Sequence, residues 1–93
     1  MQFEHDAARS RWLLKQGGQI VSALDYADNG RVVSMTRAFT NPPFRGHGYA
    51  GDLVQHVVDE VERQGKRVRP MCWYVAQWFD EHPERAALLE DAA

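Results

Sequence analysis

The sequence is poor in cysteine. Its one cysteine, Cys72, cannot form an internal disulfide, so we expect a reducing compartment, and the cytoplasm is the default. One cysteine and four scattered histidines also form no metal-binding pattern, so we expect no metal ion.

Long apolar runs and an excess of charge of one sign are also missing. No stretch approaches the roughly 20 apolar residues of a membrane-spanning helix, and the acidic N-terminus lacks the apolar core of a signal peptide. The formal net charge is -2, and no basic tract is present. We therefore expect neither nucleic acid nor a membrane surface as a partner.

The chain can form one small domain over 1–93 with a modest hydrophobic core, since 44% of its 93 residues are hydrophobic. The first half shows the alternation and the turn signals of strands. We predict strands over residues 3–5, 11–15, 19–26 and 31–39, with a hairpin turn at 28–30. Alternation places four side chains on one face of the third strand: Ile20, Ser22, Leu24 and Tyr26. These strands indicate an antiparallel meander.

The second half changes to a helical period. Apolar side chains recur with helical spacing at five positions: Leu53, Val54, Val57, Val58 and Val61. We predict an amphipathic helix from about Gly48 to Gln64 that ends near Gly65. A short strand over 66–71 and two short helices over 73–81 and 83–90 follow. This order indicates an α+β fold in which helices cover a mostly antiparallel sheet.

A glycine-rich turn, residues 45–51, lies between the meander and the long helix. Its glycines let backbone N–H groups approach an anion, the helix N-terminus adds its positive dipole end, and Arg45 adds a full charge. The same glycines also suit a plain helix entry that binds nothing. The spacing Gly46-x-Gly48-x-x-Gly51 matches a dinucleotide-binding pattern, but an antiparallel meander precedes it and too little chain follows for that fold.

A second register of the turn, Arg45-x-x-Gly48-x-Ala50, resembles the Q/R-x-x-G-x-G/A coenzyme loop of the GCN5-related N-acetyltransferases. The whole chain resembles a small subfamily whose members lack the helices that follow the first strand of larger enzymes. Other segments that carry the resemblance are residues 4–12, 23–26, 41–50, 69–76 and 82–84. The tail matches Pro-x-Cys-x-Tyr and then His-Pro-Glu: Pro70, Cys72, Tyr74, His82, Pro83 and Glu84. The resemblance implies a minimal fold of this family, with one long helix after the coenzyme loop.

The chain departs from the subfamily pattern at three places. His-Thr usually precedes the coenzyme loop, whereas this chain has Arg37 and Ala38. The proline after the tail cysteine is replaced by Trp73, and the tyrosine after His-Pro-Glu is replaced by Arg85. The coenzyme pattern is therefore complete, and the departures concern residues on the acceptor side.

The resemblance also implies roles for individual residues. Backbone groups of Phe39 and Thr40 would bind the pantetheine arm of acetyl-CoA. The loop would hold the pyrophosphate with Arg45, Gly46, His47, Gly48, Tyr49 and Ala50. Cys72 would lie in the active site, to protonate the departing thiolate or to accept the acetyl group, although a lone cysteine is more commonly a small buried apolar side chain. Tyr74 is a candidate general acid, or a packing residue of the short helix.

The function that follows is transfer of an acetyl group from acetyl-CoA, as cosubstrate, to a primary amine of a protein or small polyamine. The alternative is a catalytically weak acetyl-CoA-binding module that acts as a sensor or interaction protein, and the departures motivate it. Either a monomer or a homodimer is compatible with the sequence. We expect the three tryptophans in the core, with the acceptor pocket as the other location for Trp73.

Overall fold

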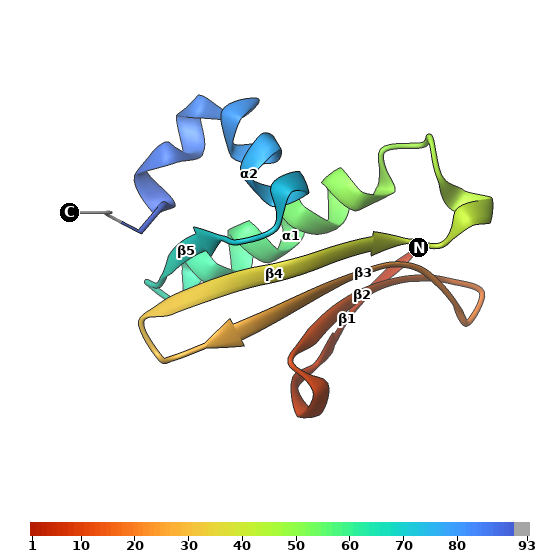
Figure 1. Cartoon of the computed structure of the whole chain (residues 1–93). Coiled ribbons are helices and arrows are strands. Elements are labelled where there is room, and N and C mark those ends of the chain that lie inside the picture. The colour runs from red at the N-terminus through yellow and green to blue at the C-terminus, as the bar shows by residue number, and fades with distance from the viewer. Residues whose placement is uncertain (91–93) are drawn as a thin grey trace.

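The computed structural model describes residues 1–90, and five strands form one sheet in the order β1-β2-β3-β4-β5 (Figure 1). Residues 91–93, part of the expected domain, lie outside the described residues. The strands are β1 (Gln2–Asp6), β2 (Arg11–Gln16), β3 (Gln19–Asp28), β4 (Val32–Thr40) and β5 (Arg67–Pro70). The predicted meander is confirmed, because β1 to β4 pair antiparallel in chain order. β5 pairs with β4 in parallel.

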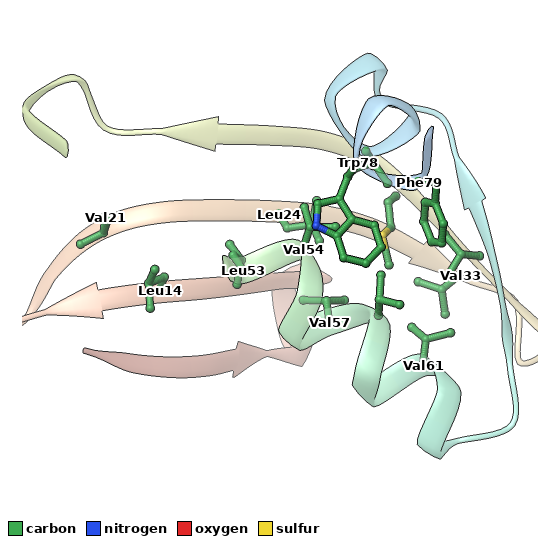
Figure 2. Close-up of a cluster of buried hydrophobic side chains, with 14 residues drawn as sticks. Leu14, Val21, Leu24, Val33, Leu53, Val54, Val57, Val61, Trp78 and Phe79 are labelled. Atoms are coloured by element: carbon green, nitrogen blue, oxygen red, sulfur yellow. The ribbon is translucent and has the colours of Figure 1, made fainter. Parts of the chain in front are cut away.

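Two α-helices pack against one face of this sheet. α1 (Tyr49–Arg63) agrees with the predicted long helix, and it buries the predicted apolar stripe: Leu53, Val54, Val57, Val58 and Val61. α2 (Trp73–Asp80) adds Val75, Trp78 and Phe79 to the same core. Figure 2 shows Trp78 and Phe79 directed from α2 toward side chains of α1 and the sheet. The α+β fold indicated by the order of elements is therefore confirmed.

A β-bulge in β3 changes the side-chain alternation that the sequence predicts. Leu14 of β2 pairs with Ser22 and the next residue, Lys15, pairs with Ile20, so Val21 is an extra residue. Val21 is buried in the core, whereas Ile20 is 40% exposed. The prediction that Ile20 shares a face with Ser22 is wrong, because the extra residue reverses the alternation at this point.

The C-terminal segment also differs from the prediction. In place of a helix over 83–90, a 3-10 helix, η3 (Pro83–Leu88), is followed by Leu89 in a parallel bridge to Val68 of β5. The Glu90 N–H donates to the Val68 carbonyl at 2.8 Å. An extended segment at this position satisfies backbone groups of the edge strand β5, which a longer helix would leave unpaired.

The three tryptophans differ in burial. Trp78 is buried, and Trp12 packs partly buried against the core. Trp73, however, is 75% exposed, so its predicted place in the core is wrong. The reason is its position on α2, where Val75 and Trp78 form the buried face and Trp73 lies on the solvent side.

β4 and β5 separate partway along β4. Their pairing begins at Val32 with Arg67 and ends at Met35 with Pro70, whereas β4 continues to Thr40 (Figure 1). Among the described residues, no strand pairs with this later part of β4 on the side of β5. A bulge in β4 lies at the same point, because Tyr26 pairs with Met35 and Asp25 with Arg37. An open strand edge thus begins where the chain leaves β5 for α2.

Candidate active site

The loop after β4 owes its shape to glycine. η2 (Pro42–Phe44) makes one 3-10 turn, and the chain then passes through Gly46 at φ 84° and Gly48 at φ 77°. Side chains other than glycine are strained at such angles. A β-carbon added at either glycine would meet nothing within 4 Å. The backbone of the loop therefore faces open space, where a ligand can approach it closely.

The N-terminus of α1 supplies hydrogen-bond donors to this space. Its first intrahelical bond runs from the Asp52 N–H to the Gly48 carbonyl at 3.1 Å, so the amides of residues 48–51 have no intrahelical acceptor. The guanidinium of Arg45 donates through Nε to the Thr40 carbonyl at 3.3 Å. Within residues 1–90 no carboxylate pairs with it. Free amides, the helix dipole and an uncompensated cation together favour an anion.

A cavity of about 160 Å³ joins the loop to α2. Its lining comes from the end of β4, η2, the loop, the first turn of α1 and one side chain of α2: Thr40, Phe44, Arg45, Gly46, Gly48, Tyr49, Ala50 and Tyr74. Most of the predicted site residues therefore meet here. His47 lies outside the lining and stacks on Tyr49, with ring centroids 5.4 Å apart.

Two larger hollows lie elsewhere. One, of about 340 Å³, lies between β1 and α1, and the other, of about 230 Å³, lies on the sheet face that carries Leu13, Ile20 and Phe39. Neither is lined by a residue of the glycine loop or by a free helix N-terminus. We therefore assign the site to the smaller cavity, because anion-binding groups and a titratable hydroxyl converge only there among these three.

Tyr74 reaches the cavity from α2. Its hydroxyl oxygen lies 3.4 Å from the point where a β-carbon on Gly51 would stand, so the phenol rests against the first turn of α1. Burial, and then the negative charges of Glu81 and Asp52, raise the pKa of Tyr74, since both disfavour the phenolate. Tyr74 is therefore a neutral phenol near neutral pH, which is the form that donates a proton.

Cys72 is not one of the residues that line this cavity. It is the N-cap of α2, is partly buried, and packs against the core. The carbonyl of Met35 accepts hydrogen bonds from the N–H groups of both Met71 and Cys72, each at 3.0 Å. The structure thus places Cys72 where β4 and β5 separate, and Tyr74 two residues later beside the loop.

The end of β4 directs alternate backbone groups toward its open edge. The Phe39 carbonyl accepts a hydrogen bond from Ser22 Oγ at 2.8 Å, and the Asn41 N–H donates to β3 at 2.9 Å, so these groups face β3. Strand alternation then directs the backbone of Ala38 and Thr40 to the open edge. The sequence prediction assigned this edge to Phe39 and Thr40, but the Phe39 carbonyl faces β3, and Ala38 is the residue that shares the open side with Thr40, because the bulge in β4 decides which residues alternate toward β3.

Among residues 1–90, no group of three or more His, Cys, Asp or Glu side chains is arranged to hold a metal ion. In that range no helix has both the length and the apolar character needed to cross a membrane.

Sequence comparison places this architecture among known proteins. A family model described as GCN5-related N-acetyl-transferase matches residues 11–88. The match begins with β2 and ends with η3, so it includes the glycine loop, α1 and α2. A comparison with curated proteins gives no match.

Solved structures show the same fold at low sequence identity. A GCN5-like protein from Staphylococcus aureus aligns with a TM-score of 0.74 over 99% of this chain and 90% of its own, at 9% identity. The ribosomal-protein-S18-alanine N-acetyltransferase from Escherichia coli aligns with a TM-score of 0.62 over 77% of this chain and 50% of its own, at 15% identity. A predicted acetyltransferase from Clostridium acetobutylicum, solved with acetyl-CoA, aligns with a TM-score of 0.54 over 77% of this chain and 55% of its own, at 16% identity. This chain thus spans about half the length of the latter two.

Proposed function

Because this chain belongs to the GCN5-related N-acetyltransferases, we propose that residues 1–93 form one domain that binds acetyl-CoA and transfers its acetyl group to a primary amine. The observation that carries the proposal is the cavity in which a glycine-shaped anion site meets the neutral phenol of Tyr74. The acceptor is an amine of a protein or a small molecule. The cytoplasm is the proposed compartment, since Cys72 is a free thiol.

In this proposal, residues 45–50 bind the pyrophosphate of the coenzyme. The amides of residues 48–51 donate to phosphate oxygens, and Arg45 neutralises part of their charge. Glycine at 46 and 48 keeps the backbone bare on the side of the ligand. His47, a loop residue stacked on Tyr49, adds a ring nitrogen near the phosphates.

The pantetheine arm follows the open edge of β4. Its amide groups take the place of the absent strand partner and form hydrogen bonds with the backbone of Ala38 and Thr40. From the loop, this path leads along β4 toward Met35, where β4 and β5 separate. The thioester then lies near the start of α2, between Tyr74 and Cys72.

The transfer needs a placed thioester, a neutral amine and a proton for the leaving sulfur. The amine nitrogen bonds to the acetyl carbon, the C–S bond breaks, and coenzyme A leaves. Tyr74 donates its phenolic proton to the sulfur, the new amide loses its extra proton to solvent, and solvent reprotonates the phenolate. We propose direct attack by the amine, with Cys72 beside the path and without an acetyl-cysteine.

The position of Cys72 outside the cavity wall favours a second candidate function. In that case the chain binds acetyl-CoA through the same loop but transfers slowly, and serves as a sensor or interaction protein. Both candidates share the coenzyme site, so binding and turnover have to be measured separately.

Calorimetry with acetyl-CoA tests the coenzyme site. We expect Arg45→Ala to weaken binding about tenfold, because it removes a charged donor to phosphate. Arg31→Ala is the matched control: it removes the same charge from the β3–β4 turn, and we expect wild-type affinity. No binding by the wild type at submillimolar acetyl-CoA would refute both candidate functions.

Thiol release from acetyl-CoA in the presence of amines separates the two candidates. Release that depends on a primary amine, with the acetylated amine found by mass spectrometry, supports the enzyme. Binding without amine-dependent release, over a panel of amines and peptides, supports the sensor or interaction module.

A further inference from the structure

Trp73 and Met71 are large apolar side chains that the core does not use. They flank Cys72, and their exposed fractions are 75% and 62%. Tryptophan is highly buried on average, so an indole exposed to this degree leaves much apolar area in water. α2 does not need Trp73 for packing, since Val75, Trp78 and Phe79 hold the helix to the core.

The backbone holds this indole at the point where β4 and β5 separate. The Met35 carbonyl accepts from the N–H of both residues that precede Trp73, so the start of α2 is tied to β4. The ring also meets Tyr74 edge-on, at 5.8 Å between centroids and 82° between planes. Trp73 therefore follows an anchored stretch of backbone. It lies next to both Cys72 and the proposed proton donor, and most of its surface is exposed to solvent.

The surroundings carry negative charge. Asp80 and Glu81 follow Trp73 on the exposed side of α2, about two turns or roughly 10 Å further along. Glu81 and Asp52 are also close enough to Tyr74 to raise its pKa. Indole faces attract cations, and flexible methylene chains cover apolar surface, so this combination suits a positively charged alkyl chain.

We propose that Trp73 binds the acceptor, and that the acceptor is an alkylammonium chain, as in a lysine side chain or a free polyamine. Its methylene groups and ammonium group lie against the indole, the ammonium loses a proton to solvent, and the resulting neutral amine reaches the thioester beside Cys72. In a polyamine, a second positive charge on the chain meets Asp80 and Glu81. This inference rests on the proposed acetyl transfer for the role of the chain as acceptor, but binding of the chain can be measured without it.

The first test is a titration of the nitrogen-15-labelled protein, without acetyl-CoA, followed through the indole N–H signals in NMR spectra. The signal that disappears in Trp73→Ala belongs to Trp73, and those of Trp12 and Trp78 are internal controls. We expect n-butylamine to shift the Trp73 signal more than the control signals, and neutral n-butanol to leave it in place. An equal shift with both probes, or no shift at Trp73 with n-butylamine, would overturn the inference.

The second test is acetyl transfer to spermidine and to a lysine-containing peptide. We expect Trp73→Ala to raise KM for the acceptor about fivefold, which is the size of an exposed cation–π contact, and to raise KM for acetyl-CoA much less. Trp73→Phe keeps an aromatic face and should recover part of the loss. The acceptor with the higher kcat/KM identifies the source of the chain.

The two proposals fail in different ways. Unchanged KM for both acceptors in Trp73→Ala refutes the role of Trp73 while acetyl transfer stands. A specific n-butylamine shift in a wild-type protein that performs no transfer refutes the enzyme and supports the alkylammonium site.

Discussion

The hydroxyl of Tyr74 rests against Gly51, 3.4 Å from where a β-carbon on that glycine would stand. This contact joins the first turn of α1 to α2 directly at the proposed site. Gly51 has ordinary helical backbone angles, and a β-carbon there would be in van der Waals contact with the phenol, so a side chain larger than a methyl group would have to displace the phenol. The residue that borders the proposed proton donor was not among the predicted site residues.

Two substitutions at Gly51 should differ in their effect on the enzyme: a small side chain should stabilise the protein, and a large one should lower kcat. Gly51→Ala places a methyl group in ordinary contact with the phenol and raises helix propensity, so we expect up to about 1 kcal/mol of added stability and near wild-type kcat. Gly51→Leu should push Tyr74 out of the cavity and lower kcat. Thermal unfolding and steady-state kinetics of both variants measure this. Wild-type kcat in Gly51→Leu would show that the position of Tyr74 is immaterial.

Tyr74→Phe should lower kcat about a hundredfold, within the range of general acid catalysis, with a small effect on KM for acetyl-CoA. The raised pKa of Tyr74 keeps the phenol protonated as pH rises, so the wild type should show no loss of kcat from its ionisation below about pH 10. A pH profile of kcat for both proteins measures this. An unchanged kcat in Tyr74→Phe would remove Tyr74 from the mechanism.

Cys72→Ser should lower kcat less than Tyr74→Phe, because we place the thiol beside the path of transfer and not on it. The wild type incubated with acetyl-CoA alone should remain unmodified at Cys72 in peptide mass spectrometry. An acetyl group on Cys72 that is then passed to an added amine would contradict direct attack.

Gly48→Ala and Gly18→Ala form a matched pair. The two glycines have φ of 77° and 81°, and a β-carbon at either meets nothing within 4 Å. Each variant should lose about 1 kcal/mol of stability through backbone strain. Only Gly48→Ala should weaken acetyl-CoA binding in calorimetry, because its methyl group enters the proposed phosphate site. Equal affinity in the two variants would argue against pyrophosphate binding at this loop.

Asp28→Asn should make the free energy of unfolding less dependent on pH in the acidic range. Asp28 pairs with Lys66 at 2.6 Å and accepts from the Gly30 N–H at 2.7 Å, and the Lys66 bond, then the Gly30 bond, lower the pKa of Asp28. A carboxyl group whose pKa is lower in the folded state than in the unfolded state stabilises the fold at pH values above its unfolded-state pKa. This stability is lost as the pH falls through the folded-state pKa.

We therefore expect Asp28→Asn to cost up to about 1 kcal/mol near pH 7, since the pair is partly exposed. The difference from the wild type should shrink below about pH 4, near the unfolded value of an aspartate. Urea unfolding at about pH 7 and at a series of pH values below about 4 measures it, and Lys66→Met removes the same ion pair from the other side. A difference of constant size across this range would exclude Asp28 as its source.

Local features of the chain could be predicted from sequence. The spacing from Leu53 to Val61 predicted α1 and its buried face, and the turn at residues 28–30 predicted the β3–β4 hairpin. The loop glycines predicted a backbone open to an anion, and Gly46 and Gly48 do adopt left-handed angles. Each of these depends on residues a few positions apart, so periodicity and backbone preference suffice.

The sequence by itself therefore determined the antiparallel strands, the long helix and the glycine turn between them, because hydrophobic period and glycine content act over short range. Only the tertiary structure decided the parallel pairing of β5, the register shift at Val21, and the meeting of Tyr74 with the loop while Cys72 stays outside the cavity wall. It also decided that Trp73 faces solvent. These features depend on which distant segments pair and pack, and no local pattern encodes that choice.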